Sequence, residues 1–427
     1  MTTKTISNIL ILTMEENADG SLIPPFQGDI EITNDTISKI TPQQYAAEPQ
    51  QIALPGLVNA HGHAAMSLFR GYGDDMSLMS WLSDKIWPVE AKLSGEDVYW
   101  GTMLAGAEML KSGTTTFADM YYFCDDVARA VAESGLRASL TRGLIPAADA
   151  DKLAEGLEFA LKYNQTANGR ITTMLGPHAP YTNDQAFLTR VAEAARKHKL
   201  PIHIHLAETE DEIRQIITRD GCRPVEFLER CNFFADNKVL AAHGVWLNSA
   251  EIDFLQKYDV SVAHNPTSNL KLACGIAPVA EMQQKGLNVA LGTDGACSNN
   301  SLDMFAAIKL AAILAKAREL DPLVIPAAEA LKIATINGAK ALGLEDKIGT
   351  LTPGKQADII LVSLDAPHFY PRHDLISHLV YAATGSDIDT VLVAGQVLMQ
   401  NRQLQTIDEA AVKAQAERVA KRLCGTS

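Results

Sequence analysis

The stretch VLAAHGVWLNSAEIDFLQKYDVSVAH (239–264) contains the unit from which we predict the fold. It begins with a short apolar run at 239–243, continues through a longer helical pattern, and ends with a second apolar run at 260–264. Short β-rich runs that alternate with helical segments are typical of parallel strands joined by right-handed crossovers. Both runs also end in a histidine.

The same alternation extends in both directions along the chain. It gives eight candidate strands, at 57–61, 114–119, 136–142, 171–178, 202–206, 239–243, 260–264 and 288–294. Eight such units within residues 55–346 predict an α/β fold, a (β/α)8 TIM-type barrel.

The two ends of the chain have a different pattern. Residues 1–54 and 347–400 contain short strands and turns without crossover helices, so we expect antiparallel pairing there. We predict a composite β-sandwich side domain from both termini, built from 1–54 and 347–427. The latter range also ends in a helix, which Thr406 and Glu409 would cap, just as Thr182 and Gln185 would cap the helix before the fifth barrel strand.

Polar residues fall where the predicted barrel strands end. In a barrel these ends converge on one rim, which is the face that carries activity. The residues at or just beyond a strand end are His61, His63, His178, His205, His243, His264 and Asp294.

Four of these residues form a plausible set of metal ligands. His61 and His63 are two residues apart, so both side chains can point to one side of an extended segment. Together with His205 and Asp294 they offer three imidazoles and one carboxylate, which suits one divalent metal, best Zn²⁺, with a position open for water. Fe²⁺ and Mn²⁺ can share such ligands.

Three further polar residues lie near this rim. Glu208 follows His205 by three residues and can supply an acid–base group, and His243 can orient the attacking water. His203 lies one layer deeper than His205, so we interpret it as a buried, hydrogen-bonded core histidine.

Composition narrows the functional class. The 427 residues carry 37 basic and 51 acidic side chains, a net charge of −14 that disfavours nucleic acid or an anionic membrane as partner. The six cysteines form no C-x-x-C pair, and no apolar run approaches the ~20 residues that a membrane span needs. We therefore expect a cytoplasmic protein with a small-molecule substrate.

Several motifs follow one another over nearly the whole chain. They are LPGLVNAHGHAAMSLFRGYGDDMSLMSWLSDKIWPVE (54–90), GPHAPYT (176–182), HLAET (205–209), AHGVWL (242–247), HNPTSNLKLACGIAPV (264–279), LGTDGACSNNSLDMF (291–305) and TPGKQADIILV (352–362). In this order they resemble the motifs of the cyclic amidine deaminases of the amidohydrolase superfamily, and most closely those of the 5′-methylthioadenosine/S-adenosylhomocysteine deaminases.

The resemblance implies a pocket for a purine nucleoside. Glu90 matches the glutamate that such enzymes use on ribose hydroxyls, Arg142 and His178 match positions implicated in substrate binding, and Trp87 could wall the pocket. Some relatives carry a second arginine after the third strand, whereas 147–156 here contain none, which favours methylthioadenosine over S-adenosylhomocysteine. A homodimer is common among such enzymes.

The implied reaction replaces the 6-amino group of an adenine ring by oxygen and releases ammonia. Asp294 would accept the water's proton on a free second oxygen, Glu208 would protonate the ring, and His243 would stabilise the tetrahedral alkoxide. Two alternatives stay open. One is a related hydrolase acting on guanine, a pterin or a chlorotriazine, and the other is a non-catalytic barrel scaffold.

Overall fold

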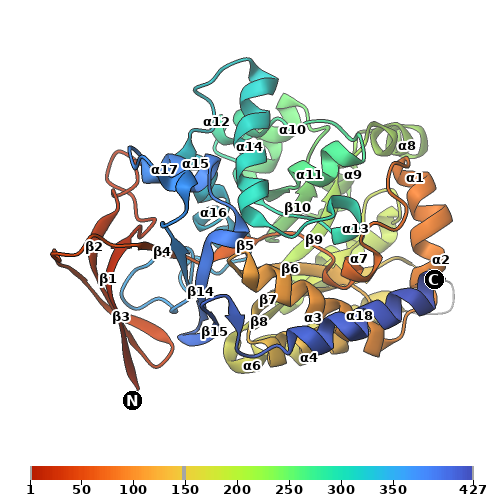
Figure 1. Ribbon diagram of the computed structural model, residues 1–427. Helices are drawn as coiled ribbons and strands as arrows, with labels where there is room; N and C mark the ends of the chain where they lie inside the picture. Colours follow the sequence, from red (N-terminus) through yellow and green to blue (C-terminus); the bar gives the residue numbers. More distant parts are fainter. Residues whose placement is uncertain (1, 147–150, 426–427) are drawn as a thin grey trace.

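The computed structural model describes residues 2–146 and 151–425 and contains two eight-stranded sheets (Figure 1). One is an all-parallel barrel with its strands in sequence order from β5 to β12. Its strands are β5 (Leu57–Asn59), β6 (Thr114–Tyr121), β7 (Arg137–Leu144), β8 (Ile171–Pro177), β9 (Ile202–Leu206), β10 (Val239–His243), β11 (Ser261–His264) and β12 (Asn288–Leu291).

The barrel closes between its first and last strands, which confirms the predicted (β/α)8 architecture. The Ala60 amide, just after β5, donates to the Leu291 carbonyl of β12 at 2.8 Å. Strands such as β9 are buried along their whole length, as expected where helices cover the outside and side chains fill the inside. The first and last strands end earlier than predicted, so His61 and Asp294 lie in the turns that follow them.

Helices surround the barrel, and their ends follow local sequence signals. Helix α3 begins with a capping box between Ser94 and Asp97, and α4 ends at Gly135, whose φ of +87° suits glycine. The longer surrounding helices are α3 (Gly95–Lys111), α4 (Cys124–Ser134), α5 (Lys152–Tyr163), α7 (Gln185–His198), α8 (Glu210–Asp220), α9 (Pro224–Arg230), α10 (Ser249–Lys257), α14 (Met304–Glu319) and α15 (Ala327–Ile333).

The second sheet joins both ends of the chain, as predicted for the side domain. Its order is β16-β15-β14-β13-β4-β1-β2-β3. The strands are β1 (Thr3–Ile11), β2 (Phe26–Thr33), β3 (Thr36–Pro42), β4 (Gln51–Pro55), β13 (Ile359–Ser363), β14 (Ile388–Val393), β15 (Gln396–Gln400) and β16 (Gln403–Leu404).

One pairing in this sheet differs from the prediction. Strands β1 and β4 are parallel, with Leu10 opposite Ile52 and Ile11 opposite Ala53. Between β1 and β4 the chain forms the β2–β3 hairpin on the far side of β1 and then returns to the near side. Strands β2 and β3 thus form the crossover connection, which in the barrel is formed by a helix. The other pairs are antiparallel.

Successive side chains of the central strands point to opposite faces of the second sheet, and both faces are buried. In β13, Ile360 and Val362 belong to the large core shared with the barrel, whereas Ile359 and Leu361 belong to a small separate core. A buried ion pair also fastens this sheet to the barrel, because Arg137 of β7 contacts the Asp358 carboxylate through Nε at 2.8 Å.

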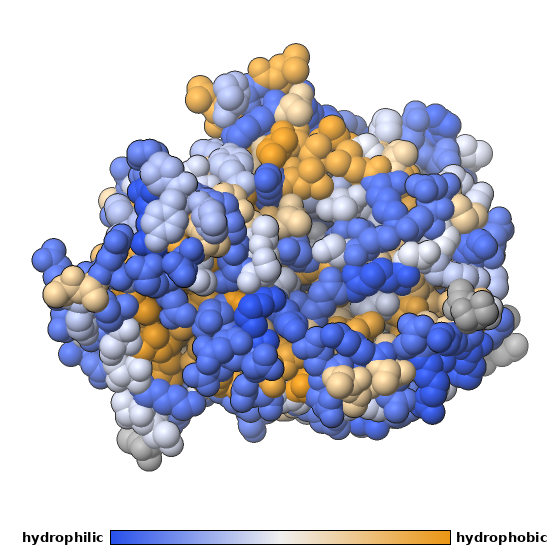
Figure 2. All heavy atoms as spheres, in the orientation of Figure 1, coloured by the Kyte–Doolittle hydropathy of each residue, from blue (hydrophilic) through white to orange (hydrophobic). Residues whose placement is uncertain are grey.

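The terminal helix α18 (Glu409–Cys424) lies along α3 on the outside of the barrel (Figure 1). Its cap is Asp408 rather than the predicted Thr406, and the same shift occurs at α7, where Asp184 accepts from the Phe187 amide. No helix in the described part of the chain is long and apolar enough to cross a membrane. Figure 2 shows a mainly hydrophilic surface, with apolar side chains gathered around α14.

Candidate active site

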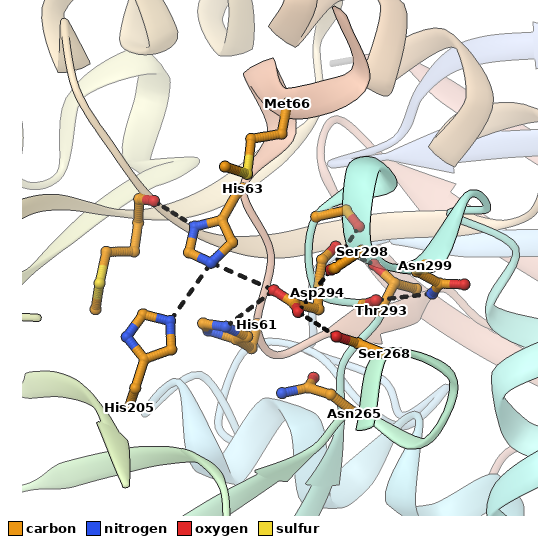
Figure 3. A network of polar contacts seen from close by, with 12 residues as sticks. His61, His63, Met66, His205, Asn265, Ser268, Thr293, Asp294, Ser298 and Asn299 are labelled. Carbon is orange, nitrogen blue, oxygen red and sulfur yellow. Dashed lines mark hydrogen bonds and ion pairs between the residues drawn. The ribbon is translucent and has the colours of Figure 1, made fainter. Parts of the chain in front are cut away.

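Four predicted ligands meet at the carboxyl-terminal rim of the barrel (Figure 3). His61 Nε2 lies 3.5 Å and His63 Nε2 lies 3.3 Å from Asp294 Oδ1. His205 Nε2 lies 3.4 Å from His63 Nε2. The side chains of His61, His205 and Asp294 are almost completely buried. Residues from opposite ends of the barrel sequence therefore converge on one point.

Contacts behind the imidazoles direct their Nε2 atoms towards this point. His63 Nδ1 donates to the Met120 carbonyl at 2.6 Å, and His205 Nδ1 donates to the His178 carbonyl at 2.8 Å. Since a carbonyl can only accept, Nδ1 carries the proton of the neutral ring, which leaves Nε2 as the atom that can bind a metal. His61 Nδ1 lies 2.9 Å from His203 Nε2, so the deeper histidine supports a ligand as well as filling the core.

The arrangement fits a divalent metal. His61 Nε2 is buried and has no hydrogen-bond partner among the described residues, which is costly unless another group occupies that position. Ligand atoms of His61, His63 and Asp294 lie within 4.8 Å of one another, and so do those of His61, His205 and His243. Imidazoles and a carboxylate are typical ligands of a catalytic zinc-type site.

The protonation states also suit metal binding. Burial lowers the pKa of His61 to about 3 and holds that of His205 well below its usual range, so both are neutral. Burial opposes charge on Asp294, but the close approach of the His61 and His63 imidazoles outweighs burial and keeps the pKa of Asp294 well below normal. Burial opposes charge on His63 too, yet Asp294 raises its pKa to about 9, so a metal must displace a proton there.

The second oxygen of Asp294 is not free, contrary to our expectation. Oδ2 accepts from Ser268 Oγ at 2.6 Å and from Ser298 Oγ at 2.8 Å. Asp294 also has a φ of +62° and His243 a φ of +78°, both in the left-handed region. Such conformations cost free energy and are concentrated at functional sites, where the surroundings impose them.

Glu208 lies beside the ligand cluster and is buried. Its Oε1 is 3.8 Å from His243 Nδ1 and 3.9 Å from Cys274 Sγ. Burial raises the pKa of Glu208, which favours the protonated carboxyl group. The Glu212 carboxylate accepts from the Glu208 amide at 2.8 Å and fixes the backbone behind it.

His243 is positioned from the neighbouring strand end. Its Nδ1 lies 2.9 Å from Asn269 Oδ1, which orients the ring at the edge of the cluster. His264 ends the next strand and is also buried, but it does not line the cavity described below.

A cavity of about 740 Å³, including its open mouth, lies above these residues. Glu208, His243 and Asp294 are at its base, and its walls include Trp87, Glu90 and His178 as predicted. One wall is a continuous helical segment, residues 78–90, formed by α1 (Leu78–Trp81), the π-helical η2 (Leu82–Ile86) and α2 (Trp87–Glu90). Turns of π-helix are frequent at functional sites.

A tyrosine that sequence reasoning missed holds Glu90. Tyr121 Oη donates to Glu90 Oε1 at 2.6 Å, and burial raises the pKa of Glu90. Tyr121 follows the second barrel strand's predicted end by two residues, so its rim position was a signal that could have been used.

Arg142 differs from the other predicted substrate residues. It does not belong to the described lining and instead forms a 2.7 Å ion pair with Glu155. In the arginine-free stretch 147–156, residues 147–150 lie outside the described residues. Sequence reasoning also missed supporting residues on other elements, namely Glu212, Ser268, Asn269 and Ser298.

Comparison with known proteins agrees with this geometry. The model of the amidohydrolase family matches residues 52–398. The chain belongs to this family. A 5-methylthioadenosine/S-adenosylhomocysteine deaminase of Desulforudis audaxviator (strain MP104C) is 54% identical over 374 residues, 87% of each chain. A 5′-deoxyadenosine deaminase of Methanosarcina acetivorans is 47% identical over 426 residues, 98% of each chain.

A solved structure of this amidohydrolase family shares the complete fold. The adenosine deaminase of Xanthomonas campestris, solved with bound zinc, superposes with a TM-score of 0.93 at 37% identity. The match covers 99% of this chain and 98% of that one. The side domain is therefore shared along with the barrel.

Proposed function

We propose that this amidohydrolase is a hydrolytic deaminase of 5′-methylthioadenosine and related adenine nucleosides, including S-adenosylhomocysteine and adenosine. The observation that carries the proposal is Glu208, a buried carboxyl group with a raised pKa beside a metal-binding cluster in one cavity. An acid next to an activated water is what addition to an aromatic amidine requires. The names of the relatives support the same chemistry.

We assign the metal to His61, His63, His205 and Asp294 and propose Zn²⁺. The zinc bound in the Xanthomonas campestris relative supports this choice, and so does the mixture of nitrogen and oxygen ligands. When bound, such a cation lowers the pKa of a water from 15.7 to about 7 and so supplies a nucleophile at neutral pH.

Three residues of the chain then carry out the proton transfers and stabilise the developing charge. Glu208, whose protonated form is favoured by burial, donates to the ring nitrogen next to C6 and makes that carbon electrophilic. Asp294 accepts the proton of the attacking water and passes it to the departing amino group, which leaves as ammonia. His243, whose Nδ1 donates to Asn269 Oδ1, stabilises in its imidazolium form the oxygen that becomes negative as the ring is attacked.

The role of Ser268 and Ser298 follows from their contacts with Asp294 Oδ2. Both hydroxyls donate to the ionised carboxylate, and a hydroxyl can turn and accept once the carboxylate is protonated. They stabilise Asp294 in both states of the transfer.

The nucleoside would extend from this base along the wall formed by residues 78–90. Glu90, oriented by Tyr121, accepts hydrogen bonds from ribose hydroxyls, while Trp87 and His178 flank the sugar and base. Arg142 would exchange its contact with Glu155 for a carboxylate where the substrate carries one.

The free thiols of all six cysteines support a reducing, cytoplasmic setting, and we propose that the enzyme acts as a homodimer.

The Glu208→Gln variant tests the assignment. We expect normal metal content and a loss of about 10²–10⁴ in kcat, because the amide cannot donate a carboxylic proton. Ammonia release would be measured with methylthioadenosine, S-adenosylhomocysteine, adenosine, adenine, guanine and a chlorotriazine. Glu210→Gln, an exposed carboxylate two residues away, is the matched control.

Each outcome has a definite meaning. Turnover of the nucleosides, with adenine and guanine inert, supports the proposed pocket. Activity only on a free base or the triazine would contradict the role of Glu90, and near-normal activity of metal-loaded Glu208→Gln would contradict the role of Glu208.

A further inference from the structure

A second cavity adjoins the active-site cavity at the rim of the barrel. It has a volume of about 1260 Å³, including its open mouth. Leu78, Tyr181, Glu208 and Leu272 line both cavities, so these four side chains form the boundary between them. Residues of α1 and α8 form part of the remaining wall, and Figure 1 shows these two helices next to each other. The proposed function uses the first cavity and leaves this second space without a role.

Apart from Glu208, the boundary consists of apolar or aromatic side chains. Leu78 begins α1, Tyr181 lies in the turn after β8, and Leu272 follows α11 (Pro266–Lys271). All three are partly buried, and the Tyr181 ring packs edge-on against the His178 ring with centroids 5.9 Å apart. Because aliphatic side chains make no hydrogen bonds, a ligand can displace Leu78 or Leu272 without leaving a polar group unpaired.

Glu208 lies between the metal-binding cluster and the second cavity. Its Oε1 is 3.8 Å from Nδ1 of His243, which lines the first cavity, and 3.9 Å from Sγ of Cys274, which lines the second. Trp87 and Glu90, the proposed ribose contacts, belong to the lining of the first cavity and not to that of the second among the described residues. The second cavity is therefore reached past the acid, not past the sugar.

The proposed reaction determines which atom of the purine faces this boundary, and the inference rests on that proposed function. Glu208 donates to the ring nitrogen next to C6, and the other ring neighbour of that nitrogen is C2. C6 has to face the metal ligands for water to attack it. C2 therefore lies beside Glu208 on the side away from the ligands, where Leu78, Tyr181 and Leu272 form the boundary.

We propose that Leu78, Tyr181 and Leu272 determine specificity at position 2 of the purine ring, and that the second cavity receives a substituent attached there. The substrate class then includes 2-substituted adenine nucleosides, for example 2-chloroadenosine and 2-phenylaminoadenosine. The chemistry at C6 is unchanged: a C–O bond to the attacking water forms, the C–N bond breaks and ammonia leaves. The substituent on C2 is retained in the product.

The second cavity suits an apolar or aromatic substituent. Met76, Met79 and Trp246 line it, and Met79 is 43% and Trp246 39% exposed. The Trp246 indole is held in place, because its Nε1 donates to the Cys274 carbonyl at 2.7 Å. The flexible methionine side chains can adapt to groups of different shape opposite this fixed ring.

Deamination of 2-substituted nucleosides relative to adenosine tests the proposal. For the wild type we expect kcat/KM for 2-chloroadenosine within about tenfold of that for adenosine. Leu272→Ala widens the boundary, so the ratio of kcat/KM for 2-phenylaminoadenosine to that for adenosine should rise about tenfold. Met79→Trp fills the second cavity and should lower the same ratio by a similar factor. Comparing each variant's ratio with the wild-type ratio removes the electronic effect of the substituent.

Leu82→Ala is the matched control, because Leu82 lines the active-site cavity from the same helical segment but is not part of the second cavity's lining. Its ratio should equal that of the wild type. Turnover of adenosine with 2-chloroadenosine slower by more than about 100-fold would overturn the proposal and leave the deaminase assignment intact. An unchanged ratio in Leu272→Ala and Met79→Trp, both folded by circular dichroism, would do the same. Failure of the zinc-loaded enzyme to deaminate any adenine nucleoside would overturn both.

Discussion

The base and the wall of the active-site cavity are built in opposite ways. At the base, His61 is 0% exposed and both His205 and Asp294 are 5% exposed, and each is fixed by a further contact behind it. In the wall formed by residues 78–90, Met79 is 43% exposed and Trp87 is 45% exposed. The base is therefore enclosed and held from behind, whereas part of the wall is open to solvent; in the proposed function the base carries the chemistry and the wall contacts the substrate.

Among changes to residues that support the base or the wall, the largest effect is expected from weakening a contact behind the base. His203→Phe removes the partner of His61 Nδ1, so the ligand loses its orientation, and metal affinity should fall about 10- to 100-fold. A competition titration with a chromophoric chelator measures this directly. At saturating metal, activity should largely return.

His203→Gln is the matched control, because its amide can still contact His61 Nδ1 and should retain most of the affinity. Unchanged metal affinity in His203→Phe would show that packing alone orients His61. The contact behind this ligand would then not be needed to hold the base in place.

The pH profile should separate the two regions. Burial raises the pKa of both Glu208 at the base and Glu90 in the wall. Glu208 acts protonated, so kcat/KM should fall about tenfold per pH unit above its pKa. Glu90 acts ionised, so kcat/KM should also fall below its own pKa. In Glu90→Gln the acidic limb should disappear and the basic limb remain. Persistence of the acidic limb would assign it to another group, such as His63.

The sequence allowed the base to be predicted better than the wall, for a physical reason. The carboxyl ends of barrel strands must converge, so identifying eight strands was enough to bring His61, His205 and Asp294 together. The contact between Tyr121 and Glu90 joins a strand end to a separate helical segment, and no local pattern specifies it. Similarly, Ser268 and Ser298 reach Asp294 from two different turns.

Helix caps and strand pairings were also predicted poorly, because more than one residue or arrangement fits the same local pattern. Thr182 and Gln185 match a capping box, yet Asp184 caps α7, and Thr182 instead contacts His178. The parallel pairing of β1 and β4 depends on where the β2–β3 hairpin lies, which the alternating pattern of each strand cannot specify.

A smaller effect is expected in the wall. Tyr121→Phe removes the hydrogen bond that orients the Glu90 carboxylate, so KM should rise about three- to tenfold while kcat changes little. Tyr122→Phe is the control, because Tyr122 lines the same cavity. Substrates that lack the ribose hydroxyls should be insensitive to the change. A fall in kcat alone would instead connect Tyr121 to the base, for example through Met120 and His63.

The smallest effect on methylthioadenosine is expected at Arg142, where the effect should depend on the substrate. Arg142→Gln removes a guanidinium group that pairs with Glu155 and does not line the described cavity, so KM for methylthioadenosine should stay within about twofold. S-Adenosylhomocysteine carries a carboxylate that could replace Glu155, and its KM should rise more, by about five- to tenfold. Glu155→Gln should act in the opposite direction, because it releases Arg142 for the substrate. Equal effects on the KM of both substrates would show that Arg142 only stabilises the rim. Discrimination between the two substrates would then depend on residues 78–90 alone.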